Sequence, residues 1–152
     1  MDAVRLIAAT RDALARSRTV PDIVAEAWQA QALAEAVGSH LAISGPPEVR
    51  TEALGLSEAG SRACGSLHHP ALRAGGVRAA QLSMIQDPRG ALLDLGGLLG
   101  ETGVALVGVA VSADEEALYW QCVEAIDAAD ESGDRVAGIL RRLALRERGG
   151  VA

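Results

Sequence analysis

Apolar residues recur at every third or fourth position over most of the chain, which is the spacing of one face of an α-helix. The first such segment covers about residues 2–17. The second, about 20–43, repeats every seven residues with alanine at its centre, which favours close approach of a neighbouring helix. The apolar positions of this second segment are Ile23, Ala27, Ala30, Ala34, Val37 and Leu41.

Polar residues and prolines predict where these helices begin and end. Thr19 can cap a helix that has a proline in its first turn and Asp22 three residues after the cap. Asp87, followed by a proline, predicts a second capped start, and Ser-Ala-Asp-Glu at 112–115 predicts a third. The sequence Ser-Gly-Pro-Pro at 44–47 ends the second helix.

The middle of the chain predicts one firm helix and one weak one. The periodic pattern continues over about 47–66. Residues 70–86 also read as a helix, but the pair Gly75 and Gly76 weakens it, because each glycine costs roughly 1 kcal/mol relative to alanine.

The segment 88–111 carries two apolar faces, which indicates burial on both sides and places this helix at the centre of the bundle. Its glycines would then pack against the alanine stripe of 20–43. The β-branched residues of 104–111 also fit a buried strand, although no second convincing strand exists to pair with it. The first face is Leu92, Leu95, Leu99, Thr102, Leu106 and Val109, and the second is Leu93, Gly97, Gly100, Val104, Val107 and Val111.

The last predicted helix extends to about residue 147, either continuous or broken at Ser132-Gly133. Eight acidic residues and no basic one lie between Asp114 and Asp134, whereas five arginines and one acid lie between Arg135 and Arg148. Arginine near the C-terminus of a helix also suits the helix dipole.

Composition and charge restrict the function classes. The 152 residues fit a single domain, 1–152, of ordinary apolar (49%) and charged (22%) content. A net charge of −6 disfavours nucleic acid as a partner, since phosphate binding needs a basic face. Three aromatic residues are too few for a platform on which bases stack.

The two cysteines, Cys64 and Cys122, form neither a disulfide scaffold nor a Cys-x-x-Cys pair. The first residues do not have the pattern of a signal peptide. The most apolar run, 104–111, is eight residues long, against about 20 for a membrane-spanning helix. We therefore expect a cytoplasmic protein without membrane contact.

Two clusters of residues could carry chemistry. Acidic residues spaced three and four apart share one flank of the last helix, the geometry of a carboxylate site for Mg²⁺, although a solvated acidic face is the simplest explanation and an acidic partner-binding surface is a third. These metal candidates are Glu124, Asp127, Asp130 and Glu131. His68 and His69 precede a proline and are most simply a polar turn, but they are also ligand candidates.

The aromatic side chains Trp28, Tyr119 and Trp120 are candidates to contact a ligand or a partner, because Trp28 lies off the apolar stripe of its helix and Trp120 lies next to the stripe of the last one. Ordinary core positions explain the two tryptophans equally well. No Gly-x-Ser-x-Gly, His-Glu-x-x-His or Glu-x-x-His motif is present. No catalytic residue is assigned.

Several stretches of the chain resemble a family of small uncharacterised actinobacterial proteins, a domain of unknown function. The resemblance implies a cytosolic bacterial setting and carries over no activity, cofactor or catalytic residue. The stretches are 7–11 (IAATR), 25–33 (AEAWQAQAL), 67–71 (LHHPA), 118–122 (LYWQC) and 124–131 (EAIDAADE).

The sequence thus predicts an all-α antiparallel bundle of five or six helices with the helix at about 88–111 central. The function expected is a non-enzymatic interaction or regulatory module that self-associates or binds a protein partner, with no cofactor. The alternative is a small metal-dependent enzyme or ligand-binding bundle that uses the acidic flank of the last helix. An enzyme would need acids and histidines in one concave pocket, and an interaction module would need an exposed apolar patch.

Overall fold

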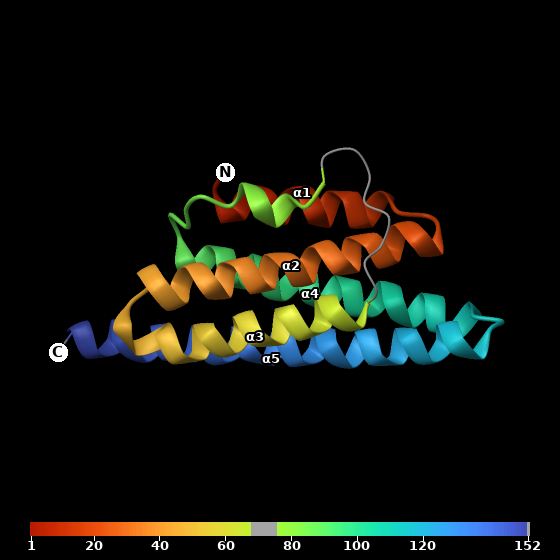
Figure 1. The fold of residues 1–152 in the computed structure, drawn as a ribbon. Helices are drawn as coiled ribbons and strands as arrows, with labels where there is room; N and C mark the ends of the chain where they lie inside the picture. The colour runs from red at the N-terminus through yellow and green to blue at the C-terminus, as the bar shows by residue number, and fades with distance from the viewer. Residues whose placement is uncertain (68–75, 152) are drawn as a thin grey trace.

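The computed structural model describes residues 1–67 and 76–151, and these form five α-helices and two short 3-10 turns (Figure 1). This confirms the all-α bundle. The elements are α1 (Ala3–Arg16), α2 (Val20–Ser44), η1 (Pro47–Val49), α3 (Arg50–Ser66), η2 (Arg78–Gln81), α4 (Pro88–Ser112) and α5 (Glu116–Val151).

The four longer helices pack as a bundle, and α1 lies against α2 and α4 (Figure 1). Helices joined by short connections, α1–α2, α2–α3 and α4–α5, are antiparallel. Helices α3 and α4 run in the same direction, with the segment 67–87 between them. Its part 76–87 is held at α1, where the Ala3 amide donates to the Met84 carbonyl at 3.0 Å.

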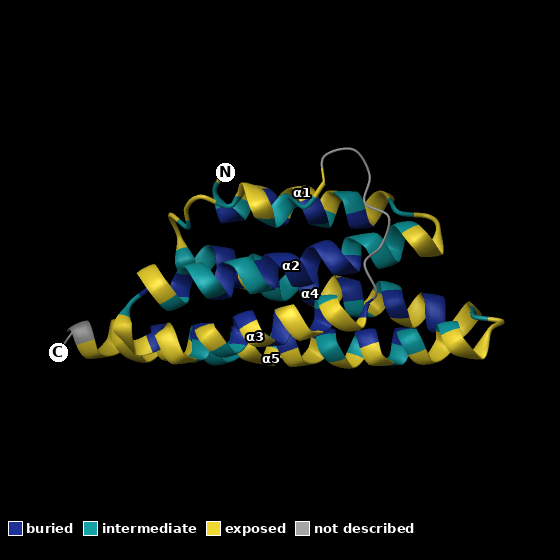
Figure 2. Cartoon of the chain, in the orientation of Figure 1, coloured by how far each residue is buried: buried dark blue, intermediate teal, exposed yellow. Residues whose placement is uncertain are grey.

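Buried side chains form two clusters along the bundle. The larger gathers residues from all five helices, among them Leu6, Leu33, Leu56, Leu95 and Ile139. The smaller lies around Trp28, Leu106 and Cys122. Each buried leucine or isoleucine contributes about 1.5–3 kcal/mol. In Figure 2 the buried residues turn toward the interior, and the exposed ones follow the outer sides of α3 and α5.

Two of the three predicted helix starts are confirmed. The Thr19 hydroxyl accepts a hydrogen bond from the Asp22 amide at 3.2 Å, and the Asp87 carboxylate accepts one from the Gly90 amide at 3.0 Å. The third start, at Ser112, is wrong. Ser112 is the last residue of α4, and its hydroxyl donates to the Gly108 carbonyl of the same helix. Helix α5 begins at Glu116 instead.

The predicted weak helix over 70–86 is also wrong within the described residues, which start again at 76. Only Arg78–Gln81 forms a 3-10 turn. Gly76 has a φ of +61°, a left-handed conformation that no α-helix continues. The remainder of 76–87 finds hydrogen bonds at the N-terminal end of α1 rather than along a helix of its own.

Both alternatives that the sequence left open resolve as helix. Residues 104–111 belong to α4 and not to a strand. Helix α5 is continuous through Ser132 and Gly133. Ser132 is buried, and its hydroxyl donates to the side-chain oxygen of Gln31 in α2, so the residue is used in packing and does not break the helix.

The central position belongs to α2 rather than to α4. Helix α2 contacts α1, α3, α4 and α5, and its residues 27–34 are all buried. Helix α4 contacts α1, α2 and α5 and buries the first predicted face. The second face is not buried: Leu93, Val104, Val107 and Val111 are exposed. Two apolar faces therefore do not mean two buried faces here.

The alanine stripe of α2 does not pack against Gly97 and Gly100 of α4, since a Cβ atom added to Gly97 would lie closest to Arg11 and one added to Gly100 would meet no atom within 4 Å. A Cβ atom added to Gly38 of α2 would lie 2.5 Å from the backbone nitrogen of Ser57. One added to Gly60 of α3 would lie 2.7 Å from the carbonyl oxygen of Gln31. The α2 and α3 backbones thus touch directly, and the close approach predicted for the small residues occurs between these two helices.

Candidate functional site

An apolar strip of α4 lies at the surface, and we call it the α4 stripe: Leu93, Gly97, Gly100, Val104, Val107 and Val111, all exposed except Gly97, which is partly covered. The exposed fraction is 56% for Leu93, 74% for Val104 and 82% for Val111. The six positions are spaced four, three, four, three and four residues apart, so they share one side of the helix. Between Thr102 and Ser112 the helix has no charged residue.

The glycines make the α4 stripe shallow. A Cβ atom added to Gly100 of the stripe, or to Gly103 or Gly108 beside it, would meet no other atom within 4 Å, whereas one added to Gly97 would stand 3.4 Å from Arg11. Neither a packing clash nor a left-handed φ requires glycine at these positions. Their effect is to leave the backbone of α4 open to any helix that comes against it.

A strong ion pair borders the α4 stripe on the side of α1. The guanidinium of Arg11 donates two hydrogen bonds to the Glu101 carboxylate, at 2.6 and 3.1 Å. The same guanidinium lies beside Gly97, 3.4 Å from where a Cβ would stand. Its hydrogen bond to Glu101 raises the pKa of Arg11. This edge of the stripe is therefore polar, with the Glu101 carboxylate paired to Arg11 and the charge of Asp94 acting on the same guanidinium.

The three predicted aromatic contacts have different environments. Trp28 is buried in the smaller core cluster and is not a surface residue. Tyr119 and Trp120 lie exposed near the start of α5, with ring centroids 5.3 Å apart in an edge-to-face arrangement. Only this second pair is therefore placed where a partner could reach it.

The predicted metal ligands Glu124, Asp127, Asp130 and Glu131 are all exposed on α5. Three of them, Glu124, Asp127 and Glu131, border a shallow hollow of about 330 Å³ between α3 and α5. Arg62 from α3 pairs with Glu131 there at 2.5 Å. No three His, Cys, Asp or Glu side chains within residues 1–67 and 76–149 are grouped so that they could hold a metal ion.

The remaining predicted candidates and the thiols add no reactive centre. His68 and His69 lie outside the described residues. Cys64 is half-buried, and burial together with the charge of Glu35 raises its pKa to about 12. Burial also raises the pKa of Cys122. Both thiols are thus held protonated at neutral pH and are poor nucleophiles.

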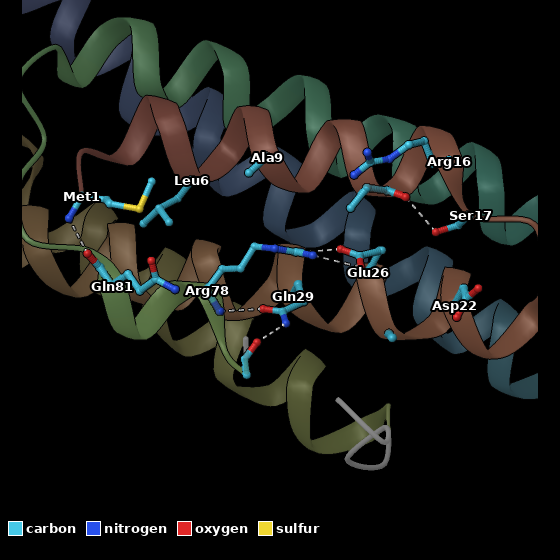
Figure 3. A pocket seen from close by; sticks show the side chains of 13 residues that line it. Met1, Leu6, Ala9, Arg16, Ser17, Asp22, Glu26, Gln29, Arg78 and Gln81 are labelled. Atoms are coloured by element: carbon cyan, nitrogen blue, oxygen red, sulfur yellow. Dashed lines mark hydrogen bonds and ion pairs between the residues drawn. The ribbon is translucent and has the colours of Figure 1, made fainter. Parts of the chain in front are cut away.

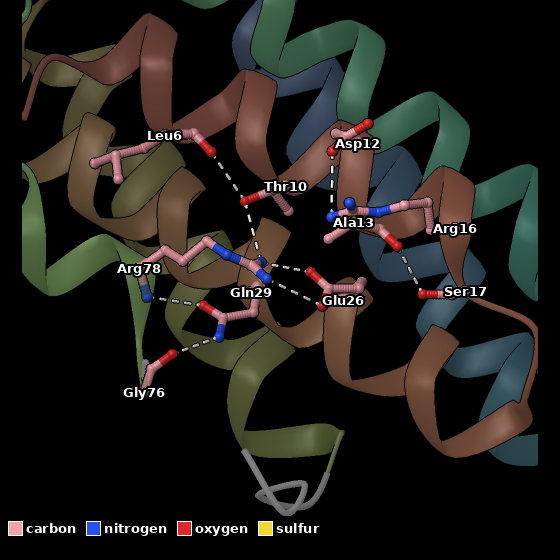
Figure 4. A network of polar contacts seen from close by, with 10 residues as sticks. All are labelled: Leu6, Thr10, Asp12, Ala13, Arg16, Ser17, Glu26, Gln29, Gly76 and Arg78. Atoms are coloured by element: carbon pink, nitrogen blue, oxygen red, sulfur yellow. Dashed lines mark hydrogen bonds and ion pairs between the residues drawn. The ribbon is translucent and has the colours of Figure 1, made fainter. Parts of the chain in front are cut away.

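A cavity of about 540 Å³ lies between α1, α2 and the segment 76–81 (Figure 3). Arg78 crosses it from this segment and pairs with Glu26 of α2 through both of its terminal nitrogens, at 2.5 and 3.2 Å. One of these nitrogens also approaches the Thr10 hydroxyl at 3.4 Å (Figure 4).

The buried amide of Gln29 completes this network. Its nitrogen donates to the Gly76 carbonyl at 2.8 Å, and its oxygen accepts from the Arg78 amide at 3.0 Å (Figure 4). These polar groups already satisfy one another, so they fasten the segment 76–81 to the bundle and offer few bonds to a ligand. Sequence reasoning missed the network because Arg78 and Glu26 are 52 positions apart and belong to no motif.

Helix α4 also meets the length and composition of a membrane span, the only helix of the described residues that does so. The apolar part of this helix is longer than the eight-residue run 104–111 identified from the sequence. Fewer than half of the residues in its most apolar window are buried. Its buried face belongs to the core of the bundle, and its exposed face is the α4 stripe.

Comparison with known proteins identifies the family. The chain belongs to a family of unknown function, DUF6099, whose model matches residues 1–142. The match covers all five helices, α5 in part. Neither a curated protein nor a solved structure matches the chain significantly.

Proposed function

We propose that this protein is a non-enzymatic helical interaction module that associates with itself through the α4 stripe. The observation that carries the proposal is the exposure of this apolar strip, which extends from Leu93 to Val111, about 27 Å along the helix. Contiguous apolar surface of this kind on a soluble protein marks a contact site. Scattered exposed apolar residues such as Ile43 and Leu54 need no such explanation.

The rival class, a metal-dependent enzyme or ligand-binding bundle, has weaker support. The acids of α5 are spread along an exposed flank, and Glu131 is already engaged by Arg62. The cavity between α1, α2 and the segment 76–81 is crossed by the Arg78–Glu26 pair. A catalytic site would need a nucleophile, base or metal group converging on one pocket, and the described residues offer no such constellation.

The test is the oligomeric state of the protein and of two matched variants, measured by sedimentation velocity between 1 and 100 µM. At the upper concentrations the apparent mass of the wild type should be twice the 15.6 kDa mass of one chain. Val104→Asp should be monomeric, because a buried unpaired carboxylate opposes the contact. Ile43→Asp, at an equally exposed site of α2, should behave as wild type.

Circular dichroism should show the same helical content for all three proteins, since both substituted side chains are more than 70% exposed. A wild-type protein that stays monomeric at 100 µM would contradict the proposal. So would a Val104→Asp variant that still forms dimers.

A further inference from the structure

The geometry of the α4 stripe points to one particular arrangement of two copies. We infer that the α4 helices of two chains pack antiparallel, with Gly100 of each copy opposite Val104 of the other. This rests on the proposed self-association and adds to it the contact surface, its direction and its register.

The spacing of the stripe reads the same in both directions along α4, namely four, three, four, three and four. A two-fold axis at the point midway between Gly100 and Val104 therefore brings every stripe residue opposite another stripe residue. Leu93 meets Val111, Gly97 meets Val107, and Gly100 meets Val104. A two-fold contact of this kind is closed, so it stops at a dimer.

The side-chain volumes favour this direction over the parallel one. In the antiparallel register both glycines face a valine, and the larger leucine faces a valine at each end. A parallel pair would place Gly97 and Gly100 opposite themselves and would leave a void there. It would also stack Val104, Val107 and Val111 against their own copies. Only the antiparallel pair keeps the two helices at an even distance along the contact.

The charged residues at the edge of the α4 stripe are compatible with a second copy of the chain as the partner that covers it. A two-fold axis across the helices brings the α1 sides of both copies to the same edge, so the two Glu101 residues approach one another. Each Glu101 carboxylate is already neutralised by two hydrogen bonds from its own Arg11. The two Glu101 residues therefore do not meet as unpaired like charges.

The charges near the α4 stripe and the net charge of the chain disfavour a lipid surface as the partner that covers the stripe. Interfacial helices carry Lys and Arg beside their apolar face, and they often carry Trp or Phe on it. The two arginines near the α4 stripe are both engaged by carboxylates, Arg11 by Glu101 and Arg89 by Glu147. The chain as a whole has a charge of −6, which anionic lipid would repel.

Disulfide cross-linking tests the direction and the register. In the double variant Leu93→Cys/Val111→Cys, mild oxidation should cross-link most of the protein as a covalent dimer, with peptides around 93 and 111 joined. The two positions are about 27 Å apart along one helix, so the link cannot form within a chain. Each single variant should give little dimer, because its cysteines lie about 27 Å apart in the pair. The unsubstituted chain controls for Cys64 and Cys122.

Each other outcome overturns the inference in a different way. If Val111→Cys alone cross-links to itself, the helices are parallel. If the double variant does not cross-link although the wild type forms a dimer that Val104→Asp disrupts, the register is wrong and the proposed function survives. If the wild type is monomeric, both fail. Flotation of the wild type with vesicles of phosphatidylglycerol and phosphatidylcholine, lost in Val104→Asp, would make the stripe a membrane surface instead.

Discussion

The hydroxyl of Ser132 in α5 donates a 2.7 Å hydrogen bond to the side-chain oxygen of Gln31 in α2. Both residues are buried, at 0% and 3% exposure, in a core that is otherwise almost wholly apolar. A single polar pair of this kind restricts how α5 can rotate and slide against α2, because any other register leaves both groups without a partner.

Removal of this hydroxyl should destabilise the fold. We expect Ser132→Ala to lower the free energy of unfolding by about 1–3 kcal/mol, because the Gln31 oxygen loses its partner inside the core. Urea titration followed by circular dichroism measures this. Ser61→Ala, at an exposed position of α3, should change stability by less than about 0.5 kcal/mol. Equal effects of the two substitutions would contradict the role given to the pair.

Glycine substitutions should have opposite effects at two positions. Gly38→Ala should destabilise by more than the ~1–3 kcal/mol typical of overpacking, because its Cβ would stand 2.5 Å from the backbone nitrogen of Ser57. Gly133→Ala in α5 meets no atom within 4 Å and should stabilise by up to about 1 kcal/mol through helix propensity. Thermal melts of both variants decide the point, and a Gly38→Ala protein as stable as wild type would rule out the close α2–α3 contact.

The Arg78–Glu26 pair should control the local stability of the segment 76–81. In Glu26→Gln the bidentate ion pair is lost, while the Gln29 hydrogen bonds to this segment remain. Hydrogen exchange at the backbone amides of 80–82 should accelerate by about tenfold or more, equivalent to at least ~1.4 kcal/mol. Amides in the middle of α3 should be unaffected. Uniform acceleration over the whole chain would instead indicate global destabilisation.

The thiol of Cys64 should make stability depend on alkaline pH. Its pKa is about 12 in the folded protein and returns to the ordinary 9.0 on unfolding. The unfolded chain therefore releases a proton above pH 9 that the folded chain keeps, so stability should fall as the pH rises from 9 towards 12. Comparison of urea midpoints at pH 8 and 10 for wild type and Cys64→Ala measures this, and the variant should show the smaller decrease. An identical decrease in both would show that other groups cause it.

Short-range patterns in the sequence predicted most of the fold. The side chains of Thr19 and Asp87 each accept a hydrogen bond from the amide three residues later, so the local sequence alone predicts these caps. Ser112 has the same type of motif but bonds back into α4, because its hydroxyl can reach the Gly108 carbonyl one turn earlier. The local pattern does not determine whether the Ser112 hydroxyl caps α5 or bonds back into α4.

Long-range relationships account for what the sequence could not predict. A close backbone approach was expected between the alanine stripe of α2 and the glycines of α4, but it occurs where Gly38 of α2 and Gly60 of α3 face the neighbouring backbone. The apolar second face of α4 looked like core, because hydropathy alone does not distinguish core from an exposed contact surface. The Arg78–Glu26–Gln29 network joins segments about 50 residues apart and has no periodicity that could reveal it.

The contact between the α2 and α3 backbones also has a consequence for the folding kinetics. The two helices are joined only by Gly45 to Val49, so their closest contacts arise between residues near in sequence. Loop closure over so short a connection costs little entropy, whereas the contacts of α5 with α2 must wait for most of the chain. We therefore expect the hairpin of α2 and α3 to form first and α4 and α5 to dock on it afterwards. A bulky residue at Gly60 would then slow refolding far more than it speeds unfolding.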